Sequence, residues 1–376
     1  MSIKYQGAAG LVDSFPIQAR TIPFRERDKD GNLVPWELGG DPSTPTIVSR
    51  VRRQIYSMIS AKRQADMYRP LSVALNLLGL EVSLPHEEKV VVFVPCSTGS
   101  LRVQEGLAPK VDLVALLASR DASLEVIKGD RVSTTTPGAH EALAIVEIST
   151  SNDLMDYCLH YTVITAQNRA SPASQFGLAV TKQWFRLLEV GLDFWRPYQR
   201  VDWQSESCIE ELYCCVKLIK NEAMRLHNAR SMTPRLNCTL RTRRTLLPTY
   251  CVTANRKRYD LFPVSIGRDP SRRPFVALAS RGEHLKDARI LKYSWRQEDK
   301  PHIEYQILKK IQDVPGVIQV DDKLCSSRAD YDPCSGFVRE ILATKVPGSP
   351  LCSCKSVKEF LEAIYDLLEG VFSVCL

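Results

Sequence analysis

The chain has 376 residues, of which 44% are hydrophobic and 25% charged, the composition of an ordinary globular protein and a length sufficient for two domains. Its twelve cysteines are too sparse for a small disulfide-rich secreted scaffold, and no CxxC pair recurs at the spacing of a zinc site. The N-terminus lacks a signal-peptide pattern, and the longest apolar runs are shorter than the ~20 residues of a membrane helix. We therefore expect a cytoplasmic or nuclear protein without a membrane partner.

The N-terminal part of the chain predicts a lead-in followed by helices. Residues 1–45 are rich in charge, glycine and proline, so we expect a poorly ordered segment there. From Thr46 onwards, apolar residues recur at helical spacing through residues 48–67, which predicts a helix. A second helix is predicted over residues 70–81, ending near Gly79.

Strand-like and helix-like segments follow through the rest of the first domain. Runs rich in Val, Ile and Leu predict strands at residues 89–96, 111–119 and 141–150. Helices are predicted over residues 154–165, 175–188 and 209–227, and an aromatic strand or loop over residues 191–203. This pattern predicts a mixed α/β domain spanning residues 46–224.

Two acidic residues, Asp112 and Glu147, lie on the predicted strands of this domain. Paired carboxylates on neighbouring strands resemble the metal-binding core of restriction-endonuclease-like folds, in which a lysine follows the second acid by two residues. Ser149 stands at that position, which disfavours Mg²⁺-dependent nuclease chemistry and leaves two acids without a metal as the simpler interpretation. His160 and Tyr161, nearby in the sequence, are interpreted as packing or surface residues.

A basic segment over residues 225–258 separates the two domains. It contains nine basic residues and no acidic one: Arg225, Arg230, Arg235, Arg241, Arg243, Arg244, Arg256, Lys257 and Arg258. Such a segment is interpreted as a solvated linker, and the alternative is a surface that binds the phosphates of a nucleotide, nucleic acid or anionic membrane.

The second domain, residues 259–376, begins with predicted strands. These cover residues 261–268, 274–280 and 288–296, and a helix around Glu304 follows. Two more strands are predicted over residues 316–322 and 336–344. The last predicted helix, over residues 356–369, opens with a capping box formed by Ser356 and Glu359. The domain is thus predicted to be a five-stranded antiparallel sheet with one helix, followed by a further helix, and the chain as a whole to be α+β.

A lysine on the third of these strands and a glutamate on the helix suggest a phosphate-binding site. Lys292 precedes Glu304 by 12 residues. In protein kinases a strand lysine neutralises the α- and β-phosphates of ATP, and a helix glutamate holds that lysine in an ion pair. The alternative is an exposed strand lysine and a solvated helix glutamate, since such pairs also arise by chance.

Several short motifs in order resemble the fungal-type protein kinase family over roughly residues 260–370. Members carry a lysine–x–x–tryptophan in the third strand, a VPG turn after the helix and an R-x-x-L…G-x-P-L passage at the hinge. The corresponding residues here are Lys292 with Trp295, Val314–Gly316, Arg339 with Leu342, and Gly348, Pro350 and Leu351. Members of this family often carry an acid pair like that of Asp112 and Glu147 ahead of the kinase lobes.

The resemblance implies a protein-kinase-like small lobe, serine/threonine phosphotransfer to a protein as the family activity, and ATP with Mg²⁺ as cofactor. Gly267 stands at the start of the expected glycine-rich loop, but Arg268 and Asp269 follow in place of further glycines, which weakens the expected grip on the nucleotide. No HRD-type or DFG-type tripeptide occurs in the 376 residues, so we expect no phosphotransfer by this chain alone. A non-catalytic module that binds nucleic acid or protein is the alternative.

Overall fold

The computed structural model describes residues 47–84, 87–96, 101, 110–129, 137–139, 141–149, 154–167, 174–192, 194–228, 233–234, 250–254, 257–266, 274–280, 288–312, 318–332, 336–345 and 354–365. The predicted lead-in over residues 1–45 lies outside these ranges, as does most of the basic segment 225–258.

The chain divides into two compact units, which are described separately. The first unit runs to Asn228, and the second contains the described residues from Thr233 onwards. Each unit contains a seven-stranded sheet with helices, so the α+β class is confirmed. No helix among the described residues is long and apolar enough to cross a lipid bilayer.

The sheet of the first unit has the strand order β1-β2-β3-β4-β5-β6, with β7 also paired to β5. Its strands are β1 (Lys89–Pro95), β2 (Leu113–Ser119), β3 (Ala144–Ile148), β4 (Gln175–Val180), β5 (Trp184–Val190), β6 (Trp195–Pro197) and β7 (Val201–Asp202). Neighbouring strands are antiparallel except for β3 and β4, which are parallel. The strands predicted over residues 89–96, 111–119 and 141–150 are confirmed.

The helix predicted over residues 175–188 is wrong, because this segment forms β4 and β5. All six residues of β4 are buried, so the strand shows none of the alternation between apolar and polar residues that identifies a half-exposed strand. The aromatic segment over residues 191–203 supplies the short strands β6 and β7.

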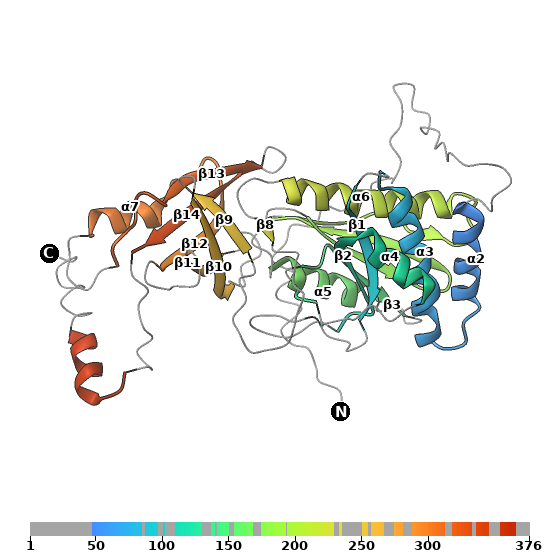
Figure 1. Ribbon diagram of the computed structural model, residues 1–376, viewed down its shortest axis with the longest axis horizontal. Helices are drawn as coiled ribbons and strands as arrows, with labels where there is room; N and C mark the ends of the chain where they lie inside the picture. The colour runs from blue at the N-terminus through green and yellow to red at the C-terminus, as the bar shows by residue number, and fades with distance from the viewer. Residues whose placement is uncertain are drawn as a thin grey trace, which may run out of the picture. The chain divides into compact units, whose positions relative to one another are not determined.

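Helices cover both faces of this sheet (Figure 1). The first face is covered by α2 (Ile47–Ile59), α3 (Ala65–Glu81) and α6 (Cys208–Asn228), and the opposite face by α5 (Leu154–Gln167). Because α5 connects the parallel strands β3 and β4, it forms the crossover that a parallel pair requires. The predictions of helices over residues 154–165 and 209–227 are confirmed.

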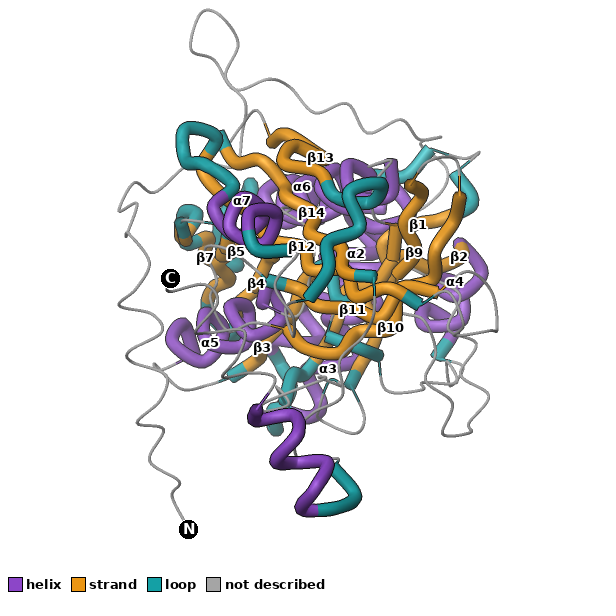
Figure 2. Tube along the Cα trace, turned by 90° about the vertical axis from the view of Figure 1, so that its left-hand side faces the viewer, coloured by secondary structure: helices purple, strands orange, loops and turns teal. Residues whose placement is uncertain are grey.

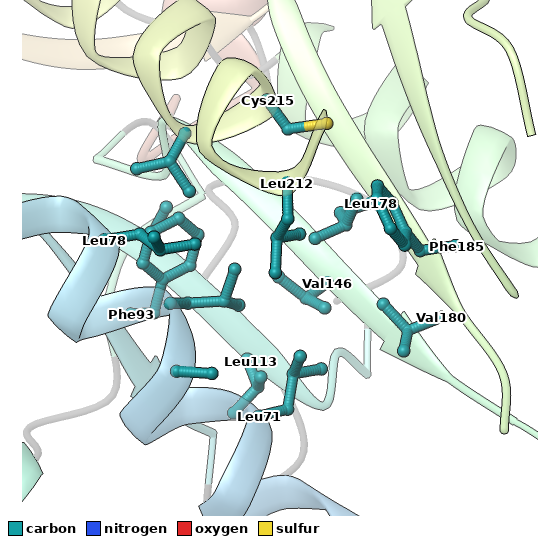
Figure 3. Close-up of a cluster of buried hydrophobic side chains, with 14 of the residues drawn as sticks. Leu71, Leu78, Phe93, Leu113, Val146, Leu178, Val180, Phe185, Leu212 and Cys215 are labelled. Atoms are coloured by element: carbon teal, nitrogen blue, oxygen red, sulfur yellow. The ribbon is translucent and has the colours of Figure 1, made fainter. Parts of the chain in front are cut away.

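The larger of the two apolar clusters lies between the sheet and the first set of helices (Figure 3). Leu71 and Leu78 of α3 and Leu212 of α6 are fully buried against Phe93 and Val146 of the sheet. Side chains that face this cluster alternate along β1 and β3 with side chains of the second apolar cluster, so both faces of these strands are buried.

The two N-terminal helices meet at a different place from the one predicted. We expected the second helix to begin at Pro70, but α3 begins at Ala65 and continues through that proline. Met67 and Leu71, on either side of Pro70, are both 0% exposed, so their burial offsets the backbone hydrogen bond that the proline cannot make.

A helix that was not predicted, α4 (Arg120–Lys128), follows β2 directly. The Ser119 hydroxyl accepts a hydrogen bond from the backbone N–H of Ala122, and Gly129 ends the helix at a φ of 87°. This serine and glycine are the usual residues at the two ends of a helix, and they were the sequence signal that could have identified it.

The second unit contains an antiparallel sheet with the order β13-β14-β12-β11-β10-β9-β8. Its strands are β8 (Thr233–Pro234), β9 (Tyr250–Ala254), β10 (Lys257–Ile266), β11 (Phe275–Ser280), β12 (Arg289–Gln297), β13 (Ser326–Asp332) and β14 (Phe337–Thr344). Strands β9 to β14 are labelled in orange in Figure 2. Four of the five predicted strands correspond to β10, β11, β12 and β14, and the sheet is extended by β8 and β9, which lie within the segment 225–258 that was predicted to be a linker.

The strand predicted over residues 316–322 is wrong. Within its described part only Val320 makes an isolated bridge, to Thr344, and the strand beside β14 is the more polar β13. The predicted segment was chosen for its apolar residues. The observed strand β13 lies at the edge of the sheet, where a strand pairs on one side only and its side chains can be polar.

Two helices accompany the second sheet in the described ranges. Helix α7 (Ile303–Lys310) connects β12 to the segment before β13, as predicted for the helix around Glu304. Residues 357–365 are helical, and the Ser356 hydroxyl accepts a hydrogen bond of 3.1 Å from the backbone N–H of Glu359, as the capping box predicts. Gly370, the expected C-terminal cap, lies outside the described residues.

Candidate functional site

In the second unit, Lys292 and Glu304 form the ion pair that the spacing predicted. The Lys292 Nζ donates to Glu304 Oε1 at 2.8 Å and to Oε2 at 2.7 Å. The two side chains are 35% and 50% exposed, so solvent and ligands reach the pair. An ammonium held in this way has a fixed position and a third N–H left for a phosphate oxygen.

The strand that carries Lys292 has two different faces. Leu291, Tyr293 and Trp295 are buried, whereas Lys292 and Arg296 lie on the opposite, partly exposed face. Strand geometry therefore directs these two basic side chains to the same side, where Lys292 meets α7.

The residues of the kinase-like motifs pair across β12 and β14. Lys292 lies opposite Leu342, and Trp295 lies opposite Arg339. The Arg339 guanidinium lies over the ring of Tyr293, 5.5 Å from its centre. Val314–Gly316, Gly348, Pro350 and Leu351 lie outside the described residues.

The other expected nucleotide-binding residue, Gly267, also lies outside the described residues. For ATP, the described residue that fits is Lys292, whose held ammonium suits the charge of the phosphates. For Mg²⁺, the described part of the chain holds no group of three or more His, Cys, Asp or Glu side chains that fits a metal ion.

In the first unit, Asp112 and Glu147 lie at neighbouring strand ends, and each carboxyl group accepts a backbone hydrogen bond from the other residue's strand segment. The backbone N–H of Ile148 donates to the Asp112 carboxylate at 2.7 Å, and the backbone N–H of Asp112 donates to the Glu147 carboxyl group. The sequence prediction that brings these two acids together is therefore correct.

The two carboxyl groups differ in their surroundings. Glu147 is 8% exposed, and its Oε1 is buried with no hydrogen-bond partner among the described residues. Burial, together with the charge of Asp112, raises the pKa of Glu147 to about 9. Burial also raises the pKa of Asp112, but its hydrogen bonds oppose that rise, so Glu147 is the member of the pair that holds a proton at neutral pH.

Two residues of helix α3 and the turn before it complete this polar cluster. The Tyr68 hydroxyl and the Gln64 amide both hydrogen-bond to Asp112, and Gln64 also donates to the carbonyl of Ile148. Burial, together with the acidic groups of Glu147 and Asp112, raises the pKa of the Cys96 thiol to about 11. We did not predict Gln64 or Tyr68, because no local pattern shows which face of α3 meets the ends of β2 and β3.

The residues present do not fit the Mg²⁺ ion that the nuclease resemblance implies. Hydrogen-bond donors from the protein already surround the Asp112 carboxylate, and Glu147 holds a proton at neutral pH. Ser149, in the position of the lysine, donates its backbone N–H to the Val180 carbonyl at 3.1 Å. We therefore derive no metal-dependent step at this cluster.

His160 and Tyr161, which were interpreted as packing or surface residues, lie on α5, where Tyr161 packs against the second apolar cluster. Both side chains are partly exposed, and their rings lie 5.6 Å apart. Burial lowers the pKa of His160.

No model of a known protein family, no curated protein and no solved structure matches this chain. The two side-chain clusters described above therefore carry the functional argument.

Proposed function

We propose that the second unit is the small lobe of a fungal-type serine/threonine protein kinase and that it binds ATP with Mg²⁺. The observation that carries this proposal is the ion pair between Lys292 on strand β12 and Glu304 on the following helix α7, in which the ammonium donates to both carboxylate oxygens. A strand lysine that is held by a helix glutamate and still reaches solvent is what a phosphate clamp requires.

The order of the strands supports the same proposal. Helix α7 is inserted between β12 and β13, and the chain then returns so that β14 pairs with β12. A protein kinase small lobe has this arrangement of an antiparallel sheet with one helix that faces the lysine strand. The sheet of the second unit continues through β9 and β8, which is an addition to that arrangement.

The proposed role is nucleotide binding without phosphoryl transfer by these residues. Lys292 would hold the α- and β-phosphates, and Glu304 would hold Lys292. Bound Mg²⁺ would neutralise the phosphate charge. It would bind as a complex with the nucleotide and would not need a set of protein ligands of its own. The chain contains no HRD-type or DFG-type tripeptide to position a hydroxyl nucleophile and the metal.

The test is whether ATP and MgCl₂ stabilise the full chain. Hydrogen exchange of the β12 peptide and thermal unfolding measure this stabilisation. A ligand at about 100 times its Kd stabilises a protein by about 2.7 kcal/mol. We expect protection of β12 in the native protein and none in Lys292→Ala. The matched control is Lys309→Ala, which removes a lysine of α7 and its ion pair with Asp322 and leaves the clamp intact. Equal protection of the native protein and Lys292→Ala would reject the proposal.

The alternative is a binding module for nucleic acid or protein, which rests on the basic segment 225–258. Nucleic-acid binding that weakens steeply with salt and is indifferent to ATP would favour it. Arg258, at the start of β10, is exposed and lies 3.8 Å from Asp260. The positive charge at this end of the basic segment is therefore partly balanced by a neighbouring acid.

A further inference from the structure

Helix α7 is not held in place by a hydrophobic core. None of its eight residues is buried, and Ile303 and Ile307 are 56% and 51% exposed. Most short helices in proteins are stabilised by the packing of an apolar face. The position of α7, and with it the position of Glu304, therefore depends on specific contacts at its ends.

The residue that precedes α7, His302, makes the buried contact at its N-terminal end. His302 is 6% exposed, and its Nε2 lies 3.5 Å from Oε2 of Glu340 on β14. Arg296 of β12 donates to the other oxygen of the same carboxylate. The imidazole also stacks on Tyr305, with 5.3 Å between ring centres and 15° between ring planes.

This contact and the phosphate clamp lie on one face of β12. Lys292 and Arg296 are four residues apart and point to the same side of the strand. Lys292 meets Glu304 in the first turn of α7, and Arg296 meets Glu340, which in turn meets His302. The first turn of the helix is thus attached to β12 at two places.

Two further contacts attach α7 to a different segment. Lys309, near the C-terminal end of the helix, pairs with Asp322, and the hydroxyl of Tyr305, nearer its N-terminal end, donates to the same carboxylate at 3.1 Å. Both partners of the Lys309–Asp322 pair are more than one-third exposed, whereas Arg296, His302 and Glu340 are nearly buried. Buried polar contacts of this kind are costly to break, so the N-terminal attachment is the one that fixes the helix.

We propose that His302 and Glu340 are positioning residues for the Lys292–Glu304 ion pair. They hold the first turn of α7 against β12 and β14, and Glu304 reaches Lys292 while that contact is made. The role of the pair in binding phosphate rests on the proposed function, but the contact between His302 and Glu340 does not require a nucleotide.

The experiment measures how fast the Lys292 amine is acetylated in the nucleotide-free full chain, by limited reaction with an amine-acylating ester and peptide mass spectrometry. An ion pair occupies the amine and slows its acylation. Glu304→Ala sets the rate of the unpaired lysine, and Lys358, with a side chain that is 85% exposed, is the internal reference in every sample. We expect His302→Ala to raise the Lys292 rate about two- to fivefold, towards the Glu304→Ala rate, as fits a pair of this exposure.

Three further variants separate positioning from simple loss of packing. In His302→Gln the side-chain amide N–H can donate to Glu340 from about the position of the imidazole Nε2, so we expect the native rate of Lys292 acylation to return. Glu340→Gln keeps the shape of the acceptor and removes its charge, and it is the second test if His302→Ala does not fold. Lys309→Ala, which releases the other end of α7, is expected to leave the Lys292 rate unchanged.

A native Lys292 rate in a folded His302→Ala or Glu340→Gln variant would overturn the proposal, and so would a raised rate that His302→Gln fails to lower. A parallel sample with ATP and MgCl₂ tests the proposed function independently. If ATP fails to protect Lys292 in the native protein while the His302 effect is present, the nucleotide proposal fails and the positioning role stands.

Discussion

The backbone N–H of Asp112 donates to the carboxyl group of Glu147, while the backbone N–H of the next residue, Ile148, donates to the carboxylate of Asp112 at 2.7 Å. The two acids are thereby fixed to each other's strands. Burial is the main cause that raises the pKa of Glu147, whose Oε1 has no hydrogen-bond partner among the described residues, whereas the hydrogen bonds of Asp112 oppose the rise that burial causes there. This cluster joins α3 to the sheet of the first unit through Tyr68 and Gln64.

The protonated Glu147 predicts that the first unit loses stability as pH rises. The pKa of Glu147 is raised from 4.5 to about 9, so the stabilising contribution of its proton is fully present below the unfolded pKa and is lost as pH rises to about 9. We expect Glu147→Gln, which is neutral at every pH, to be similar to the native protein near pH 5 and more stable near pH 8. Thermal unfolding from pH 5 to 9 measures this difference, with a slope of up to about 1.4 kcal/mol per pH unit. A difference in stability between the two proteins that stays the same from pH 5 to pH 9 would contradict the assignment of a proton to Glu147.

Removal of the Asp112 carboxylate is expected to destabilise the first unit. Asp112→Ala leaves the Ile148 N–H and the Tyr68 hydroxyl without their acceptor, at a cost of about 1–3 kcal/mol. Tyr68→Phe removes one donor only, so about 0.5–1.5 kcal/mol is expected. Urea unfolding monitored by circular dichroism measures both, and an effect of Tyr68→Phe larger than that of Asp112→Ala would contradict this arrangement.

The close approach of α3 to β1 predicts that Gly79→Ala is destabilising. A Cβ at position 79 would lie 2.5 Å from the backbone oxygen of Val91, which cannot move aside as a flexible side chain does. In an exposed helix the same substitution stabilises by about 1 kcal/mol, so a loss isolates the steric effect. We expect a loss of about 1–3 kcal/mol in the free energy of unfolding. Unchanged or increased stability would show that α3 and β1 are farther apart.

Exchange of the two charged residues tests whether the clamp depends on the placement of the lysine. In a Lys292→Glu/Glu304→Lys double variant the ion pair can form again, so we expect it to recover the stability lost by either single variant, about 0.2–1 kcal/mol. ATP should fail to stabilise the double variant, because the ammonium now lies on the helix. Isothermal titration with ATP and MgCl₂ gives the binding result. Native affinity in the double variant would show that the nucleotide binds elsewhere.

Local sequence patterns predicted the helices α5 and α6 and the strands β1, β2, β3, β12 and β14. Most of these strands are short runs rich in apolar residues, even where, as in β3 and β14, every residue is buried. The segment of β4 and β5 was predicted as a helix because a short apolar run does not by itself distinguish a strand from a buried helix, and β13 was not predicted because it is polar. The Lys292–Glu304 pair was predictable because twelve residues connect strand and helix directly. The contacts of Gln64 with Asp112 and of His302 with Glu340 were not, because each depends on how segments distant in the sequence pack together.

The pairing of β12 with β14 imposes an order on the formation of the second sheet. Strands β10, β11 and β12 follow one another in the sequence, and each pairs with the next. The partners of β12 in β14 lie much later in the sequence: Gln297 pairs with Phe337, 40 residues on, and Ile290 pairs with Thr344, 54 residues on. Closing such long loops is slow compared with forming a hairpin. During synthesis β12 is therefore an open edge until the chain has been made through Thr344, and Lys292 emerges on an unprotected strand that is prone to pair with other chains.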